Sequence, residues 1–473
     1  MLTANRAIQL SMALIATIIL LRLVSLGLYP LFDTTEARYG EIARIMFETR
    51  NWVTPQFDYN IPFWGKPPLH TWASAVSFSI FGVSEFAARL PHFVAGLITC
   101  YLVYLFMANQ FGKDNAVKGV LILTTCLGFQ IATGMVMTDS LLLLSITIAM
   151  LSFYHCYFNH SFIAGIFFFL ALSIGMLAKG PVAIVLVGIP LTLWSIHSKV
   201  FWASLKSLPW LIGLTLFALL TVPWYLLAEL RTPGFLDYFL WGEHVERFLV
   251  SGWQGDLYGS AHKESKGTIW LFWLAVAFPW SFVFLWLKLK NAITKKTSAT
   301  TNSQSTRLTH RYFVYWLLSP MLLFTLAGNI LPAYVLPSLP ALAILIALST
   351  IQRKTILQTS VVAASLIVFV MAYFISGSSS KVSHQEVLKN LTAEQLSQPL
   401  YYWMKRPFSA QFYSNGAAQK IASTKDLIIL DEQQKPFIFV VNQKHKSDIS
   451  VYIQSQCTKF EDNNGFSLYQ CGK

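Results

Sequence analysis

Charged side chains are scarce in this chain: Asp, Glu, Lys and Arg make up only 12% of its 473 residues, against about a quarter in soluble domains. Hydrophobic residues account for 55%, and the mean hydropathy is +0.51. The sequence lacks a glycine-rich loop of the nucleotide-binding kind, and no small-residue cleavage site follows the first hydrophobic run. These features exclude a soluble globular protein, disfavour direct use of a nucleotide, and predict that the first run stays as an anchor.

Long hydrophobic runs dominate what is present. A membrane-spanning helix needs about 20 apolar residues, and eleven stretches approach that length: 8–28, 86–110, 116–135, 140–157, 162–178, 181–197, 208–227, 268–289, 312–328, 331–350 and 356–375. The stretch 69–82 is shorter and predicts an interfacial or re-entrant helix. The expected fold class is mainly α, with a polytopic transmembrane domain of about eleven spans over residues 1–375.

Lysine and arginine in short loops predict the orientation, because they favour the cytoplasmic side. The most basic loop contains Lys288, Lys290, Lys295, Lys296, Arg307 and Arg311. Its centre, 297–306, is polar and predicts a flexible segment. An eleven-span chain then has its N-terminus inside, and 29–85, 228–267 and 376–473 lie on the outer face. No sizeable domain remains inside to hold ATP or a nucleotide sugar.

The polar tail, 376–473, alternates short apolar runs with helical pieces and predicts a small α/β domain. Cys457 and Cys471 flank a predicted hairpin, so they form a disulfide if the tail lies in an oxidising compartment, and otherwise two unpaired thiols. The net charge of +13 is attributed to loops that set topology. Anionic membrane lipids, and not nucleic acid, are therefore the expected partners.

Three acids on the predicted outer face are candidate catalytic residues. Asp33 and Glu36 begin an amphipathic helix near 34–48, where charge so close to hydrocarbon usually marks function. Asp-x-x-Glu at a helix start is also the pattern of a capping box. Asp33 is a candidate general base for an acceptor hydroxyl, a role compatible with capping. Asp139 stands at the outer start of a span, as a catalytic acid or as an N-cap.

Cations on the same face run against the cytoplasmic bias of positive charge. Lys66, Lys179 and Arg247 lie in three separate outer segments, and Arg38 follows Glu36 along the first of them. Each alone is explained by snorkelling to the headgroups. Several together suggest a phosphate or diphosphate site.

Two further candidates have simpler explanations. Tyr334 lies at the outer end of a span, where interfacial tyrosines are common. His244 beside Glu243 is a weak signal for a metal ion.

Seven motifs, in this order along the chain, resemble the C-type membrane glycosyltransferases that use polyprenyl-phosphate sugars. The similarity is strongest to the lipid A aminoarabinose transferases and their protein mannosyltransferase-like relatives, and it covers nearly all of residues 8–350. The motifs are Asp33-Thr34-Thr35-Glu36-Ala37-Arg38-Tyr39, Trp52-Val53-Thr54-Pro55, Lys66-Pro67-Pro68, Thr138-Asp139, Ala178-Lys179-Gly180, Trp241-Gly242-Glu243-His244-Val245-Glu246-Arg247 and Leu331-Pro332-Ala333-Tyr334-Val335-Leu336-Pro337.

The resemblance implies an inverting enzyme of the bacterial inner membrane with a periplasmic active site and periplasmic tail. It would move a sugar, such as 4-amino-4-deoxy-L-arabinose, from a polyprenyl-phosphate donor to lipid A or a related outer-face acceptor, as a monomer. The matching positions are Asp33 and Asp139 for the outer-loop acids, Lys66, Arg247 and Tyr334 for the donor phosphate, and His244 for a metal-associated histidine.

The chain departs from the aminoarabinose transferases at two places. Gly65 stands where they usually have Glu before the loop lysine, which removes a metal ligand, so no cofactor is expected to be required and a divalent cation is doubtful. Asn329 stands near a position where the family often has Lys.

Two other functions fit the same features. One is a protein O-mannosyltransferase-like enzyme. The other is a lipid or solute transporter, for which inverted repeats and broken helices near the membrane midplane are typical. The ionisable residues lie outside the predicted spans, which favours chemistry at the membrane surface.

Overall fold

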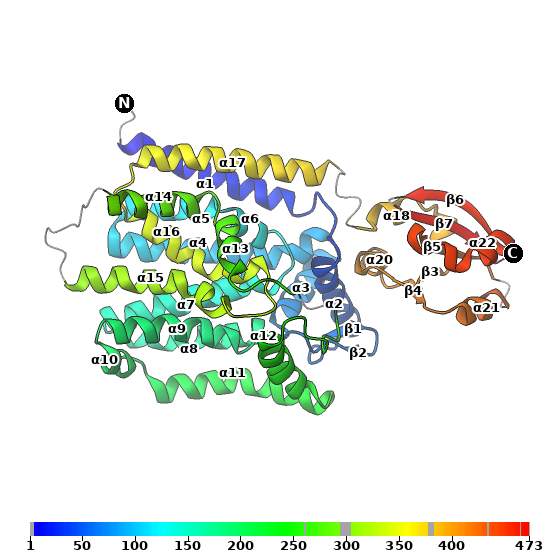
Figure 1. The fold of residues 1–473 in the computed structure, drawn as a ribbon, viewed down its shortest axis with the longest axis horizontal. Helices are drawn as coiled ribbons and strands as arrows, with labels where there is room; N and C mark the ends of the chain where they lie inside the picture. Colours follow the sequence, from blue (N-terminus) through cyan, green and yellow to red (C-terminus); the bar gives the residue numbers. More distant parts are fainter. Residues whose placement is uncertain are drawn as a thin grey trace.

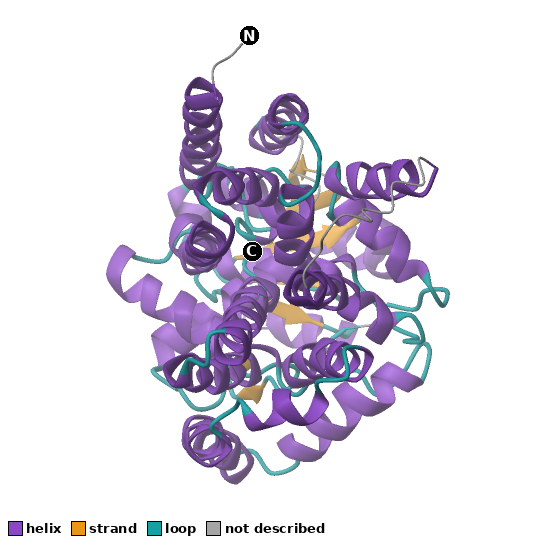
Figure 2. Ribbon diagram, turned by 90° about the vertical axis from the view of Figure 1, so that its left-hand side faces the viewer, coloured by secondary structure: helices purple, strands orange, loops and turns teal. Residues whose placement is uncertain are grey.

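The computed structural model describes residues 4–259, 262–293, 304–376, 383–432, 435–463 and 465–472. Long helices lie side by side in a bundle, and a small domain with the C-terminus lies beyond one end of it (Figure 1). Seen from the opposite end, several helices point towards the viewer and the strands lie behind them (Figure 2). The centre of the basic loop, including Lys295 and Lys296, is outside the described residues.

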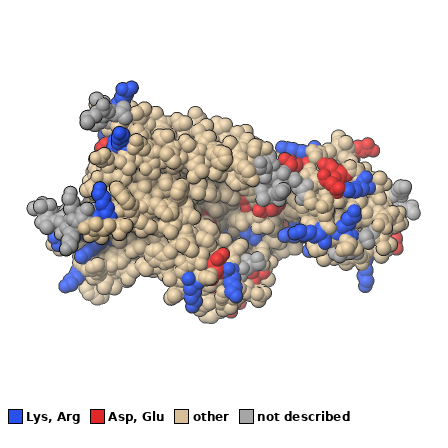
Figure 3. Space-filling view, turned by 45° about the horizontal axis from the view of Figure 1, so that its top comes forward, with Lys and Arg blue, Asp and Glu red and all other residues tan. Residues whose placement is uncertain are grey.

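Six described helices are long and apolar enough to cross a membrane. They are α1 (Ala4–Ser25), α4 (Glu85–Phe111), α7 (Thr138–Phe158), α8 (Phe162–Lys179), α11 (Trp210–Arg231) and α17 (Arg353–Ile375). In a space-filling view, charged side chains gather towards the ends of the bundle and on the tail, whereas the flank of the bundle is largely uncharged (Figure 3). The chain is a multi-pass membrane protein.

The other five predicted spans are helical but shorter, broken or partly polar. They correspond to α5 (Lys113–Thr124) with α6 (Leu127–Ala132), α9 (Val182–His197), α13 (Thr268–Val276) with α14 (Trp280–Ile293), α15 (Gln304–Phe324), and the 3-10 helix η2 (Pro332–Ser338) with α16 (Leu339–Ala347). The pair α13 and α14 bends by 107° at Pro279, which has no N–H to continue a helical ladder. The predicted count of eleven is therefore not confirmed.

Short elements cover the end of the bundle nearest the tail (Figure 1). They include α2 (Thr35–Thr49), the hairpin of β1 (Gln56–Asp58) and β2 (Ile61–Pro62), and α3 (Leu69–Phe81). At about 1.5 Å per residue, the 13-residue α3 is too short to cross a bilayer. The π-helix η1 (Asp237–Glu246) and α12 (Arg247–Leu249) follow α11, whereas α10 (Phe201–Lys206) lies at the far end.

The tail contains a five-stranded sheet in the order β4-β3-β5-β7-β6. Its strands are β3 (Leu400–Trp403), β4 (Ala418–Ile421), β5 (Phe437–Asn442), β6 (Cys457–Asn463) and β7 (Phe466–Cys471), with helices α18 (Gln385–Lys389), α19 (Ala393–Leu396), α20 (Phe408–Tyr413), α21 (Thr424–Glu432) and α22 (Ser450–Gln456). β3 runs parallel to β4 and β5, and β7 antiparallel to β5 and β6. Cys457 and Cys471 are paired across β6 and β7 and form the predicted disulfide.

The tail packs against α2 through α20. Phe412 of α20 is buried with Leu31 and the apolar face of α2. The Leu31 N–H donates to the Tyr413 hydroxyl (2.7 Å), and Arg406 forms an ion pair with Asp58 (2.6 Å). These contacts fix the tail on the end of the bundle. The division into domains 1–375 and 376–473 stays a prediction, with α17 ending at Ile375 and β3 starting at Leu400.

A buried ion pair ties the start of α2 to α4. Arg89 donates from Nε and Nη2 to the two carboxylate oxygens of Glu36 (2.7 and 2.9 Å), and both side chains are fully buried. Arg89 also donates to the carbonyls of Leu26, Tyr29 and Pro30. Glu36 accepts further bonds from two backbone N–H groups. Every oxygen of this carboxylate is thus committed to holding the fold.

We predict that Arg89→Met lowers the thermal stability of the purified protein, because it leaves the Glu36 carboxylate buried without its cation. Loss of one partner of a buried pair costs on the order of 3–5 kcal/mol. Size-exclusion chromatography after heating would measure the melting temperature, with Lys459→Met, which removes the exposed Lys459–Asp462 pair, as a control that should leave it unchanged. An unaltered melting temperature in Arg89→Met would contradict the assignment.

Candidate functional site: a cation-lined pocket

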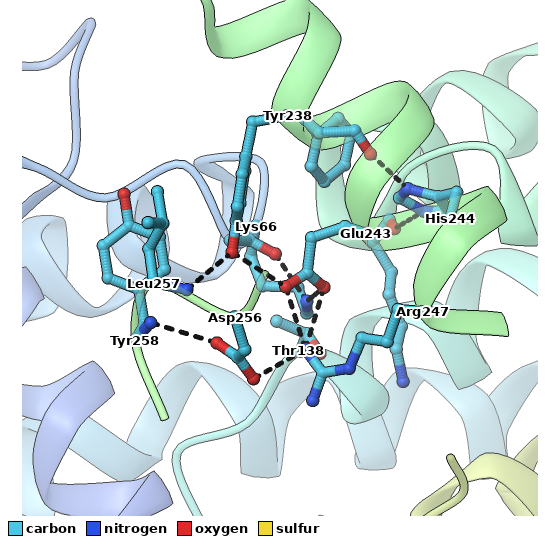
Figure 4. Close-up of polar contacts among 12 residues, drawn as sticks. Lys66, Thr138, Tyr238, Glu243, His244, Arg247, Asp256, Leu257 and Tyr258 are labelled. Carbon is cyan, nitrogen blue, oxygen red and sulfur yellow. Dashed lines mark hydrogen bonds and ion pairs between the residues drawn. The ribbon is translucent and has the colours of Figure 1, made fainter. Parts of the chain in front are cut away.

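Six of the predicted site residues converge on one pocket at the end of the bundle nearest the tail. Its polar lining comes from the loop after β2, the end of α8, the η1–α12 segment, the loop before η2 and η2 itself. It consists of Lys66, Lys179, Glu243, His244, Arg247, Asn329 and Tyr334. Val182, Phe248 and Phe324 supply apolar wall. Figure 4 shows Lys66, Glu243 and Arg247 pointing towards one another. Residues nearly 270 positions apart in the chain therefore share this site.

One carboxylate, that of Glu243, is shared by two cations. Lys66 donates to Oε2 (2.9 Å), and Nη1 of Arg247 donates to Oε1 and Oε2 (2.8 and 3.1 Å). The Glu243 side chain is only 4% exposed. Burial alone would raise the pKa of Glu243, but Lys66 and Arg247 outweigh it and lower that pKa below the ordinary value. Glu243 is therefore ionised at neutral pH and holds both cations at the pocket.

A second set of charged residues, the ion pair of Lys179 and Asp139, lies beside the Glu243 cluster. Lys179, the last residue of α8, forms a 2.5 Å ion pair with Asp139, and its Nζ lies 4.5 Å from the centre of the Tyr334 ring. Gly180 then turns the chain with a φ of +87°, and a Cβ there would approach within 2.6 Å of Phe239. Since α7 begins at Thr138, Asp139 lies inside the first turn. The N-cap interpretation of Asp139 is wrong, and the structure pairs this acid with a cation.

Two residues that sequence reasoning did not select hold Arg247 in place. Asp256 lies 3.5 Å from its Nη1. The Asn329 side chain donates to the carbonyls of Arg247 and Val250 (2.6 and 2.8 Å) and accepts from the Gly252 N–H (3.0 Å). Asp256 lies in irregular chain, where no periodicity relates it to Arg247. Asn329 drew notice only as a departure from a family pattern, and its role as a tie between two segments needed the structure.

Three predicted site residues are not brought into the pocket. Asp33 accepts hydrogen bonds from the N–H (3.0 Å) and the hydroxyl of Ser409 in the tail, and burial raises its pKa. The capping-box interpretation is wrong for Asp33, because Thr34 precedes α2 and Asp33 is bound to the tail. Glu36 is held by Arg89 as described above. Arg38 donates to the carbonyl of Tyr258 (2.8 Å).

His244 and Glu243, the weak signal for a metal ion, are not placed to hold one. Both ring nitrogens of His244 face carbonyl oxygens, Nδ1 that of Phe239 (2.7 Å) and Nε2 that of Lys179 (3.3 Å). The Glu243 oxygens are taken by cations. Gly65 offers no ligand, and the described residues contain no group of three or more His, Cys, Asp or Glu placed to share a metal ion.

We predict that the protein purified without chelator carries no stoichiometric divalent metal, since none of these donors has a free lone pair directed at a common point. Elemental analysis by mass spectrometry would measure the bound metal, and melting temperatures with EDTA and with added Zn²⁺ should agree. One zinc per chain, lost in a His244→Gln variant, would refute this.

The sequence and the fold match known membrane glycosyltransferases. Residues 7–239 match the family described as dolichyl-phosphate-mannose-protein mannosyltransferase. The chain is 29% identical over 350 residues, 72% of its length, to the undecaprenyl phosphate-alpha-4-amino-4-deoxy-L-arabinose arabinosyl transferase of Enterobacter sp. (strain 638). The enzyme of the same name from Aeromonas salmonicida (strain A449) is 28% identical over 342 residues, 70% of this chain and 58% of that protein. The chain spans about three fifths of the length of these relatives (59% for the first).

The fold resembles the crystal structure of ArnT from Cupriavidus metallidurans bound to undecaprenyl phosphate. The TM-score is 0.79 with 17% sequence identity, and the match covers 97% of each chain. The same protein in the apo state gives a TM-score of 0.77, with 18% identity and the same coverage of both chains. Together the matches show that the chain is similar in sequence to the aminoarabinose transferases and in fold to ArnT. The resemblance predicted from the seven motifs is confirmed.

Proposed function

We propose that this chain is an inverting glycosyltransferase that takes its sugar from a polyprenyl-phosphate donor. The site faces the periplasm of a bacterial inner membrane, the side predicted from the loop charges. One observation carries the proposal: Lys66, Arg247 and Lys179 converge in a largely buried pocket at one end of a membrane bundle. The names of the relatives and the undecaprenyl phosphate in the ArnT structure support this donor class.

The donor phosphate is the group that the pocket suits best. When the bond between the anomeric carbon and the phosphate oxygen breaks, the polyprenyl phosphate leaves as an anion and needs cations more than a general acid. Lys66 and Arg247 bind Glu243 in the free protein, and a phosphate would compete for the same donors. Charge interactions are stronger in a poorly hydrated pocket than in water. The leaving group would thus be stabilised by groups already in position.

The acceptor oxygen attacks the anomeric carbon from the side opposite the phosphate, which inverts the configuration. Asp139 pairs with Lys179 and not with Lys66 or Arg247, so we assign it the acceptor side of the reaction. If the acceptor is a hydroxyl, Asp139 takes its proton as general base. If it is a lipid A phosphate, the nucleophile is already anionic, and Asp139 pairs with an amino group of the sugar.

We predict that Lys66→Ala weakens donor binding by about tenfold or more, the effect of losing one charge-assisted contact to phosphate. Titration of the protein in nanodiscs with undecaprenyl phosphate would measure the dissociation constant. Lys266→Ala, which removes an exposed cation from the segment after Arg247, is the matched control and should bind normally. Unchanged affinity in Lys66→Ala would overturn the donor site.

We predict that Asp139→Asn lowers kcat at least a hundredfold, the lower range for general acid–base groups, while donor affinity changes little. Initial rates with polyprenyl-phosphate aminoarabinose and purified lipid A would give kcat. Asp33→Asn is assayed in parallel, because Asp33 matches a family acid but binds Ser409 here. A normal rate in Asp139→Asn with a lost rate in Asp33→Asn would transfer the role to Asp33.

A protein O-mannosyltransferase-like activity is the second candidate, favoured by the family match over residues 7–239. Transfer from polyprenyl-phosphate mannose to a Ser/Thr peptide, with none to lipid A, would establish it. Transport is less well supported, because Lys66, Lys179 and Arg247 lie in loops or at helix ends and not in the middle of spans.

A further inference from the structure

Arg22 lies in the last turn of α1 and takes no part in the proposed transfer. It is 6% exposed, although it sits at the end of a membrane-spanning helix. Its guanidinium packs directly on Gly134, where an added Cβ would fall within 1.5 Å of Nη2. A glycine at this position therefore makes room for the cation.

The guanidinium of Arg22 is poorly paired. Its hydrogen bond to the Ser25 hydroxyl is long (3.4 Å), and its Nε has no hydrogen-bond partner. Among the described residues, no carboxylate forms an ion pair with it. Burying a charge without a partner costs several kcal/mol, and an arginine presents five donors that fit a phosphate. Arg22 thus has a buried donor, Nε, available to an anion.

Arg22 borders a cavity of about 300 Å³ whose other walls are almost entirely apolar. They come from α6 and α17 and include Ile131, Val370 and Phe374. The flank of α17 is exposed nearby, with Phe369 70% exposed, as expected for a surface that faces lipid. The cavity shares no lining residue with the cation-lined pocket. A cation at the end of the helix matches the phosphate of a phospholipid, and the apolar cavity beside it matches an acyl chain.

We propose that this cavity is a binding site for an anionic phospholipid, distinct from the cation-lined pocket proposed for the donor phosphate. The phosphate accepts hydrogen bonds from Arg22, and an acyl chain fills the space between α1, α6 and α17. Gly134, on which Arg22 packs, lies five residues before Asp139, so a lipid bound to Arg22 would sit beside the loop that leads into α7. The occupant is a bilayer lipid because the cavity opens on the exposed flank of the bundle and contains one cation only.

The test is native mass spectrometry of the full chain in detergent, titrated with dioleoyl phosphatidylglycerol or dioleoyl phosphatidylcholine. Wild type should retain phosphatidylglycerol in preference to phosphatidylcholine, and Arg22→Gln should weaken retention of phosphatidylglycerol by about tenfold. Arg6→Gln, which removes an exposed arginine from the same helix, should retain it normally.

Val370→Trp gives an independent reading, because it fills the cavity from the lipid side and keeps Arg22. It should lower retention of both lipids. The proposal would be overturned if wild type retained the two lipids equally, or if Arg22→Gln retained phosphatidylglycerol as well as wild type does. If Arg22→Gln cannot be purified, unaltered retention in Val370→Trp would overturn it. The readout is lipid retention and not sugar transfer, so it is separate from the fate of the proposed function.

Discussion

Two partly buried cations, Lys66 and Arg247, bind the same carboxylate, and the proposed chemistry depends on this arrangement. Lys66 and Arg247 are both less than a fifth exposed and both bound to Glu243. Cations without any acid partner would be costly to bury. Glu243, with Asp256 3.5 Å from Arg247, keeps the two cations assembled at the pocket. A phosphate that enters from the membrane would meet cations whose positions are already fixed.

The scaffold explains how the cations reach one point. Lys66 precedes the two prolines that start α3, Lys179 ends α8 at a glycine turn, and Arg247 begins α12. Asn329 ties the backbone of Arg247 to the loop before η2, the helix that carries Tyr334. The tail closes over α2 at the same end of the bundle. Each cation lies at or near the beginning or end of a helix. The three charges are therefore not buried in the middle of the hydrophobic bundle.

The sequence predicted the convergence because cations on the outer face run against the usual charge bias of membrane proteins. It also predicted the disulfide, the short α3 and the helical segments. Hydropathy could not predict which apolar runs form one continuous helix, because a bend such as that at Pro279 does not interrupt the apolar run. The partners of Asp33 and Glu36 could not be predicted either. Ser409, which binds Asp33, is 376 positions away in the sequence. Arg89 is a charge in an apolar run and so was itself a signal, but no pattern in the sequence paired it with Glu36.

The most direct test of the central claim is a cryo-EM structure of the chain in nanodiscs with undecaprenyl phosphate. The account predicts phosphate density between Lys66 and Arg247, with at least one of these side chains released from Glu243, and the polyprenyl chain leaving along the flank of the bundle. Density for the phosphate at the opposite end of the bundle, or at the tail side of α2 beside Asp33 with the Glu243 pairs intact, would contradict it.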